Sequence, residues 1–273
     1  MAAVSLIALD MDGTLLDSQM RITRETLRAL RDASEAGIRL AICSGRLAGD
    51  IAMFLDEAGL EDCAILSLNG AYCLGAPGSE AYADVRLRDA TLEAAVRILR
   101  EARFPFGCFA GNRLAVMEGS FAVDGEFWGT HFHGRFAPEC LHGTEGLERL
   151  RAEGVNKLLC MAGDEAALMR ARHALCELPG LEVTSSWNLN LELMPAGVDK
   201  GRALAALARK LGIGPERVMA LGDYDNDAGM LAYAGVSVAM GNASPRARAA
   251  AKYVTLGNDE DGVALAIRRY ALS

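Results

Sequence analysis

The sequence lacks the features of several specialised protein classes. None of its seven cysteines forms a C-x-x-C pair, and their odd number does not suit a disulfide framework. No apolar run approaches the ~20 residues that cross a bilayer, and no basic segment with a long apolar stretch opens the chain, as a signal peptide would. We therefore expect a protein of the reducing cytoplasm that is not inserted in a membrane, with cysteines that are mostly small buried hydrophobic residues.

Positive charge is also scarce. The 28 lysines and arginines are outnumbered by 36 acidic residues, which leaves a net charge of −8. This balance argues against nucleic acid or an anionic membrane as the main partner. It still permits a small phosphorylated substrate, because a metal ion and local cationic side chains can make an acidic protein locally positive. A hydrophobic content of 51% over 273 residues predicts a real core in one large or two modest domains.

The first apolar segment ends in two acids. Residues 6–9 read Leu-Ile-Ala-Leu, and Asp10, Asp12 and Gly13 follow. A short continuous apolar run of this kind is typical of a strand buried on both faces of a parallel sheet. Open sheets of this type bind ligands outside the carboxyl ends of their strands. The segment therefore places two carboxylates at an expected binding edge.

Two neighbouring carboxylates repel each other unless a cation or a shared proton relieves the repulsion. Mg²⁺ prefers oxygen ligands and often retains water and substrate phosphate in its coordination shell. The pair Asp10 and Asp12 therefore suggests a magnesium site. An Asp-x-Asp-Gly sequence also occurs in ordinary turns, so this segment alone leaves both interpretations open.

Apolar runs alternate with helical patterns at both ends of the chain. Strands are expected near residues 38–43, 64–68, 218–221, 236–240 and 254–255, with helices between them, which predicts a doubly wound parallel α/β sheet. The alternation stops between residues 84 and 192. There a helix and a hairpin at 106–117 are expected, and Leu189, Leu191 and Leu193 alternate with polar residues, as in an antiparallel strand with one solvated face. We therefore predict a core of residues 1–83 and 193–273, with an inserted α+β domain of residues 84–192.

Polar residues follow several of the expected core strands. They are Asp10 and Asp12, Ser44, Asn69, and Asp223 and Asp227. In a parallel sheet these strand ends share one edge, so their side chains are expected to converge. A calcium loop of the EF-hand type at Asp223 is excluded, because Ala228 and Ala234 occupy the positions that need glycine and glutamate.

The motifs resemble those of the haloacid dehalogenase superfamily of phosphohydrolases, in its Cof-like, type IIB sugar-phosphatase branch with a C2-type cap. The matching segments are Asp10-Met-Asp12-Gly13-Thr14-Leu15, Ser44-Gly45-Arg46, Lys200-Gly201, Gly222-Asp223-x-x-Asn226-Asp227, Met240-Gly241-Asn242-Ala243 and residues 258–263. The resemblance covers nearly the whole chain and is weakest in the insert. It implies a Rossmann-like core and an enzyme that acts through an aspartyl-phosphate.

The resemblance also implies a role for each site residue. Asp10 is the nucleophile, Asp12 protonates the leaving oxygen and then activates water, and Lys200 places positive charge against the transferring group. Mg²⁺ is held by Asp10, the backbone carbonyl of Asp12, and Asp223. The remaining expectations are that Asp227 braces the water shell of the metal and Lys200, that Thr14 braces the site, and that Ser44, Gly45, Arg46, Asn69 and Asn226 contact the phosphate or the substrate.

Some residues keep two interpretations. Arg46 either binds substrate or ties its loop to an acid, and Asn69 either contacts substrate or caps its turn. In the insert, His131 and His133 are more typical of ordinary loop residues than of metal ligands. Trp128 and Trp187 either line a substrate pocket or pack in a core. We expect the insert to close over the site and set specificity without supplying a catalytic group.

The function expected from these features is a Mg²⁺-dependent phosphatase of small phosphorylated metabolites, present as a monomer or a small homo-oligomer. Two alternatives remain open. A phosphomutase of the phosphomannomutase type shares the core and cap class. A phosphate-binding regulatory protein on an inactive scaffold is less compatible with the intact acids, Ser44 and Lys200.

Overall fold

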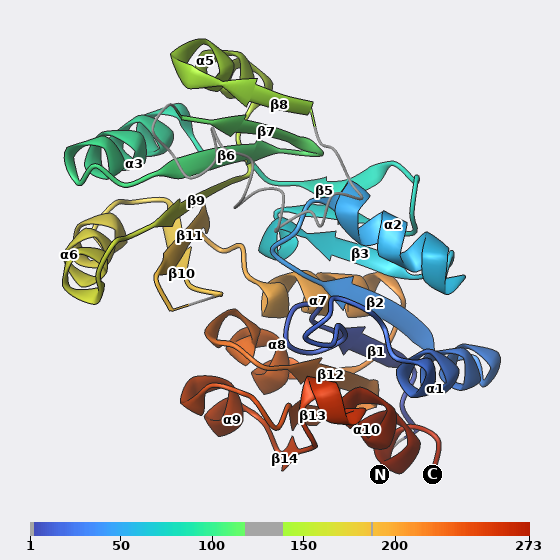
Figure 1. The fold of residues 1–273 in the computed structure, drawn as a ribbon. Coiled ribbons are helices and arrows are strands. Elements are labelled where there is room, and N and C mark those ends of the chain that lie inside the picture. The colour runs from blue at the N-terminus through green and yellow to red at the C-terminus, as the bar shows by residue number, and fades with distance from the viewer. Residues whose placement is uncertain (1–2, 118–138, 187) are drawn as a thin grey trace.

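The computed structural model describes residues 3–117, 139–186 and 188–273, and two sheets dominate it (Figure 1). The core sheet has eight strands in the order β14-β13-β12-β1-β2-β3-β4-β5, and the cap sheet has six in the order β10-β11-β9-β6-β7-β8. The core strands are β1 Leu6–Leu9, β2 Arg39–Cys43, β3 Ala64–Ser67, β4 Tyr72–Leu74, β5 Ala81–Asp84, β12 Val218–Gly222, β13 Val236–Ala239 and β14 Tyr253–Val254. The cap strands are β6 Phe106–Ala110, β7 Arg113–Val116, β8 Glu139–His142, β9 Lys157–Met161, β10 Leu181–Thr184 and β11 Asn190–Pro195.

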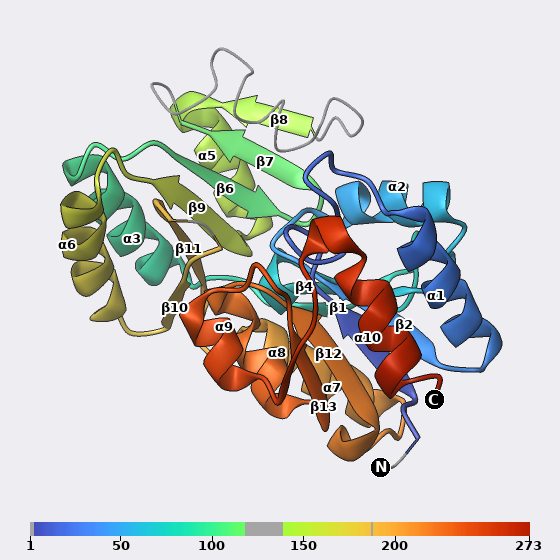
Figure 2. The same ribbon diagram turned by 60° about the horizontal axis from the view of Figure 1, so that its bottom comes forward.

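Helices cover both faces of the core sheet. The core helices are α1 Arg24–Glu35, α2 Ala48–Ala58, α7 Lys200–Lys210, α8 Ala228–Tyr233, α9 Pro245–Ala250 and α10 Gly262–Tyr270. Residues of β1 alternate between the two faces: Ile7 and Leu9 pack with α1, α2 and α10, while Leu6 and Ala8 pack with α7, α8 and α9. Figure 2 shows these two helical layers on either side of the strands. The predicted doubly wound α/β core is therefore confirmed.

Six core strands, β14 to β3 in the sheet order, run parallel. The hairpin of β4 and β5 then extends the sheet with antiparallel strands. This hairpin was not predicted, because strands of three and four residues are too short to show a period of two. Since the parallel strands end at one edge, the residues after β1, β2, β3 and β12 are brought together there.

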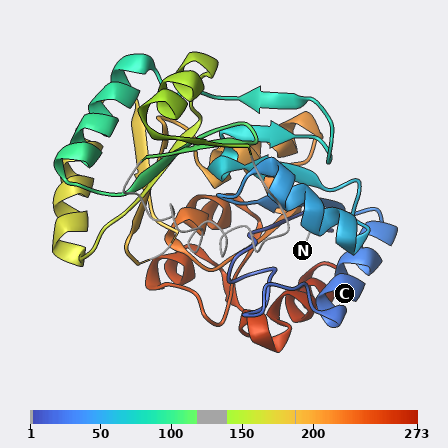
Figure 3. The ribbon, with the colours of Figure 1, turned by 45° about the horizontal axis from the view of Figure 1, so that its top comes forward.

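The cap sheet is covered on one face by its own helices. These are α3 Asp89–Glu101, α5 Gly143–Glu153 and α6 Glu165–Cys176, which lie on the side away from the core (Figures 1 and 3). On the other face, Phe109, Leu159 and Met194 of the cap pack with Leu47 and Leu68 of the core. The predicted helix and the hairpin of β6 and β7 are both present. Because β11 pairs with β9 as far as Leu193 and with β10 as far as Pro195, we propose that the insert extends to residue 195 rather than 192.

The prediction of a solvated face on β11 was wrong. All six residues of the strand are buried, including Asn190 and Glu192. The alternation of polar and apolar residues is real, but the polar side of the strand at Glu192 faces the core and not water. Alternation separates two faces of a strand and does not by itself say what covers them.

The cysteines follow the prediction. All seven are free; five are buried, and Cys140 and Cys176 are exposed. Among the described residues, no helix combines the length and the apolar character that a membrane span requires.

Candidate active site

The site begins where β1 ends. The amide of Asp10 donates to the carbonyl of Leu221 on β12 at 3.0 Å, so the chain is still held in the sheet at Asp10. Asp10 is buried, whereas half of the Asp12 side chain is exposed. The two acids therefore face different surroundings although one residue separates them.

Lys200 joins two of the strand ends. It is the first residue of α7, and its Nζ lies 2.5 Å from Asp10 Oδ1 and 2.6 Å from Asp227 Oδ1, with all three side chains buried. The second oxygen of Asp227 accepts the backbone N–H groups of Asp223 and Tyr224. Asp227 is thus held by three donors and itself holds the lysine and the loop after β12.

Asp223 closes the group of acids. Its Oδ1 accepts a hydrogen bond from the Thr14 hydroxyl at 2.8 Å. Gly13 lies against the same carboxylate with φ +77°, and a Cβ at this position would come 2.4 Å from Asp223 Oδ2. Only glycine fits this turn, because both the positive φ and the missing side chain are required.

Oxygen atoms of Asp10, Asp223 and Asp227 all lie within 4.8 Å of one another. Burial and the surrounding carboxylates raise the pKa of Asp10 well above its usual value, and burial with the nearby Asp227 raises the pKa of Asp223 to about 7. Burial opposes the charge on Lys200, but Asp10 and Asp227 outweigh it and raise the lysine pKa. Three buried acids facing one ammonium leave an excess of negative charge in an all-oxygen donor set, which fits a hard divalent cation.

Arg46 is engaged with acids. Its Nε and Nη2 donate to both carboxylate oxygens of Asp12, at 2.8 and 2.6 Å, and its Nη1 donates to Asp50 Oδ2 at 2.6 Å. The guanidinium is buried, and Asp12 and Asp50 overcome the effect of that burial to raise its pKa. In this arrangement Arg46 ties its loop to an acid, the second of its two predicted roles.

The loop of Ser44 and Gly45 connects β2 to α2. Ser44 is buried; its amide donates to Leu66 on β3, and its hydroxyl accepts the Arg46 amide at 3.3 Å. The loop therefore lies beside the ends of both β2 and β3. Backbone N–H groups at the start of a helix are suited to bind a phosphate.

Asn69 has a left-handed backbone, with φ 57°. Its side-chain amide donates to Glu192 Oε2 at 2.7 Å, and its carbonyl oxygen accepts from Asn226 at 3.4 Å. Asn69 and Asn226 thus bridge the ends of β3 and β12, the strands that precede them. All predicted core site residues are therefore gathered at one edge of the sheet.

Sequence reasoning gave no site role to four residues that touch this region; of these, only Asn242 lay in a matching motif. Lys157 and Glu192 of the cap contact the loops after β2 and β3, Asp50 binds Arg46, and Asn242 donates to the carbonyl of Gly13 at 2.8 Å. Its place as the one charged residue of the strand Asn190–Pro195 was the available signal for Glu192. We assigned that signal to a solvated face.

The predictions for the histidines and tryptophans of the insert remain predictions. Trp128, His131, His133 and Trp187 lie outside the described residues.

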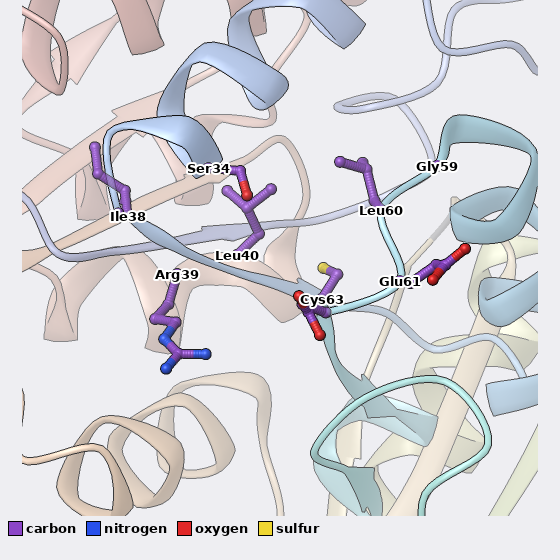
Figure 4. Close-up of a pocket in the computed structure, with 10 residues that line it drawn as sticks. Ser34, Ile38, Arg39, Leu40, Gly59, Leu60, Glu61 and Cys63 are labelled. Carbon is purple, nitrogen blue, oxygen red and sulfur yellow. The ribbon is translucent and has the colours of Figure 1, made fainter.

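A cavity of about 580 Å³ lies elsewhere, around the start of β2 and the segment that precedes β3 (Figure 4). It is lined by Arg39, Glu61 and their neighbours and by none of the predicted site residues. Because it opens beside the amino ends of these strands, it lies at the edge of the sheet opposite the cluster of acids.

Comparison with known proteins identifies a family. Residues 7–267 match the model of the haloacid dehalogenase-like hydrolases. The chain is 30% identical to the Bacillus subtilis protein named 5-amino-6-(5-phospho-D-ribitylamino)uracil phosphatase YcsE, over 98% of this chain and 96% of that protein. It is also 30% identical to the chloroplastic endoribonuclease YBEY of Arabidopsis thaliana, over 98% of this chain but only 46% of the length of that protein.

A solved structure shares the whole architecture. The crystal structure of a haloacid dehalogenase-like hydrolase from Bacteroides thetaiotaomicron superposes with a TM-score of 0.83 at 32% sequence identity, covering 97% of this chain and 99% of the other. Both the core and the insert are therefore included in the likeness.

Proposed function

The chain belongs to the haloacid dehalogenase-like hydrolases, and on this premise we propose that it is a Mg²⁺-dependent phosphatase of small phosphorylated metabolites, in the Cof-like, type IIB branch of that family. The observation that carries the proposal is the buried group of Asp10, Asp223, Asp227 and Lys200 beside the half-exposed Asp12. Three chain segments, the loops after β1 and β12 and the start of α7, converge there on a charge arrangement suited to a metal and a phosphoryl group.

Asp10 is proposed to attack phosphorus through its carboxylate and form an aspartyl-phosphate, which divides one difficult displacement into two easier ones. Lys200, 2.5 Å from Asp10, keeps this carboxylate oriented and offsets charge on the phosphoryl oxygens. The Ser44 hydroxyl and the adjacent backbone N–H groups are proposed to bind the remaining phosphoryl oxygens.

Asp12 is proposed to donate a proton to the leaving oxygen and then to remove one from the attacking water. Arg46 holds both oxygens of Asp12, so the proton transfer needs this contact to loosen when substrate enters. Half-exposure suits Asp12 for this role, because a group that exchanges protons with substrate and water must reach both.

Mg²⁺ would be held by Asp10, Asp223 and the backbone carbonyl of Asp12, with Asp227 bracing the site from behind. When bound, the ion would neutralise negative charge on the phosphoryl oxygens. The three donors that bind Asp227 support a bracing role, because both of its oxygens are engaged by Lys200 and by backbone amides.

The substrate class is proposed from a relative. The Bacillus subtilis protein is named for a phosphorylated ribityl compound, so a phosphate ester of a sugar or sugar alcohol is the first candidate here. Localisation in the cytoplasm and a monomer or small homo-oligomer remain predictions.

A panel of phosphate esters tests the function. Purified protein in MgCl₂ should release inorganic phosphate from p-nitrophenyl phosphate and, more efficiently, from at least one sugar phosphate. Absence of phosphate release from every ester would overturn the proposal. Conversion of one phosphate ester into its isomer without release would instead identify the mutase, and phosphate binding without turnover would identify the regulatory protein.

A further inference from the structure

A buried ion pair of the cap lies against the catalytic loops of the core. Lys157 opens β9 and Glu192 lies in β11, and their side chains meet at 2.6 Å with exposed fractions of 2% and 3%. Burial raises the pKa of Glu192, but Lys157 and Asn69 outweigh it and leave the pKa below its usual value. The Glu192 carboxyl therefore favours its charged form although it is buried.

Each member of the pair also binds a loop of the core. Lys157 Nζ donates to the carbonyl of Gly45 at 2.7 Å, and Glu192 Oε2 accepts the side-chain amide of Asn69 at 2.7 Å. The contact is tight, because a Cβ on Gly45 would lie 2.9 Å from Glu192 Oε1 and 3.1 Å from Lys157 Nζ. Two residues of the cap thus hold the loops that follow β2 and β3.

The hydrogen bond to Gly45 fixes the orientation of one peptide group. The carbonyl of Gly45 and the amide of Arg46 belong to the same planar peptide, and in the trans form they point in opposite directions. The structure contains no cis peptide among its described residues. When Lys157 holds the carbonyl on the cap side, the Arg46 amide is directed to the other side, where it meets the Ser44 hydroxyl at 3.3 Å.

Stability alone is a weak explanation for such a pair. A buried ion pair often contributes no more than apolar residues of the same volume, because both charges lose their hydration. The cap already has an apolar contact with the core through Phe109, Leu159 and Met194. A charged pair is better suited to orient the loops that it contacts than to strengthen the attachment of the cap to the core.

We propose that Lys157 and Glu192 are positioning residues that orient the Ser44–Gly45–Arg46 loop and Asn69 for binding of the phosphate group. The inference rests on the proposed phosphatase function and deepens it. It also changes the expected division of labour, since the cap would then help to shape phosphate binding as well as specificity. Neither Lys157 nor Glu192 is proposed to contact the substrate.

The decisive variant is Lys157→Met/Glu192→Gln, which removes both charges together and so leaves no unpaired buried charge. We expect it to unfold within a few degrees of the wild type, with KM for p-nitrophenyl phosphate and the dissociation constant of inorganic phosphate both raised about tenfold and kcat lowered less than about threefold. Phosphate binding is measured by calorimetry in MgCl₂, independently of turnover. Wild-type phosphate affinity in the folded double variant would overturn the proposal.

Two further variants complete the test. Arg113→Met breaks the cap ion pairs with Glu139 and Glu153 away from the core, and it should leave phosphate affinity unchanged. If Arg113→Met weakens phosphate binding as much as the double variant does, the loss comes from general damage to the cap, and the proposal is overturned. If the double variant does not fold, Gly45→Ala displaces the intact pair from the core side and should weaken phosphate binding, and unchanged binding would refute the inference. If the wild-type protein itself shows no phosphatase activity, the proposed function is wrong, and this outcome is distinct from a failure of the inference about Lys157 and Glu192.

Discussion

The core and the cap use charged residues in different parts of their sheets. In the core, the acids of the site follow the ends of parallel strands, whose interiors are apolar and buried. In the cap, Lys157 and Glu192 lie within strands and on the face turned to the core. A parallel sheet gathers functional groups at an edge, whereas an antiparallel sheet can present them from a face, because successive side chains point to opposite sides.

The two regions meet at an interface that is both apolar and polar. Phe109, Leu159 and Met194 of the cap belong to its apolar part. Lys157 and Glu192 form hydrogen bonds with core loops, and Asn112 accepts one from the first turn of α2. If the core contains the chemistry and the cap adjusts it, substitutions in the core should have much larger effects on turnover than substitutions in the cap.

The largest effect is expected for Asp10→Asn. An amide cannot attack phosphorus, so kcat on p-nitrophenyl phosphate should fall more than about 10³-fold while circular dichroism stays that of a folded protein. Asp12→Asn should cause a similar loss. Asp225→Asn is the matched control, because Asp225 lies in the same loop as Asp223 but binds the Ser244 hydroxyl. Retention of more than a few per cent of wild-type kcat by Asp10→Asn would contradict the assignment of the nucleophile.

Removal of metal should have the next largest effect. Excess EDTA should abolish activity, Asp223→Ala should lower it about 100-fold at fixed Mg²⁺, and Ca²⁺ should inhibit because it takes a larger and more flexible shell. Full activity in excess chelator would exclude the metal site.

The same site predicts a pH dependence of stability. The pKa of Asp223 is raised to about 7 in the folded protein. A raised carboxyl pKa contributes stability below the unfolded value of about 3.9, and this contribution is lost as the pH rises through the folded value. Mg²⁺ competes with the bound proton, so its increase in Tm should be larger near pH 8 than near pH 5.5. An equal increase at both pH values would argue against binding at these carboxylates.

An intermediate effect is expected at Arg46. Lysine cannot reproduce the paired contacts of Arg46 with both oxygens of Asp12, so Arg46→Lys should lower kcat about tenfold. Asp50→Asn keeps the shape of the other partner and should have a smaller effect. If Arg46→Lys raises KM and leaves kcat unchanged, Arg46 binds substrate, as the other sequence interpretation holds.

The smallest effect is expected for the cap residue Asn112. Its Oδ1 accepts the amide of Gly49 in the first turn of α2, which has no side-chain cap of its own. Asn112→Ala should remove about 1 kcal/mol of stability and lower Tm by a few degrees, with little change in kcat. Asn112→Asp keeps the acceptor and should restore Tm, because a negative charge is favourable at a helix N-terminus. A loss of kcat comparable to that of Arg46→Lys would contradict the contrast between core and cap.

The sequence by itself determined the core and the acids of its edge. Buried parallel strands are continuous apolar runs, and the residue after each run is defined by its position in the chain, so the convergence of Asp10, Ser44, Asn69 and Asp223 followed from local pattern and sheet topology. The hairpin of β4 and β5 escaped the same reasoning, because strands of three and four residues have too few positions to show a period.

Only the tertiary structure decided which group faces which. The partners of Arg46 are 34 residues before it and four after it, and the alternation in β11 gave no means of telling a face covered by the core from one covered by water. Lys157 and Glu192 lie 35 residues apart and meet Gly45 and Asn69 across more than a hundred residues of chain. Such contacts arise when the cap sheet docks on the core. No local pattern encodes that placement, because the residues in contact come from segments that are far apart in the chain.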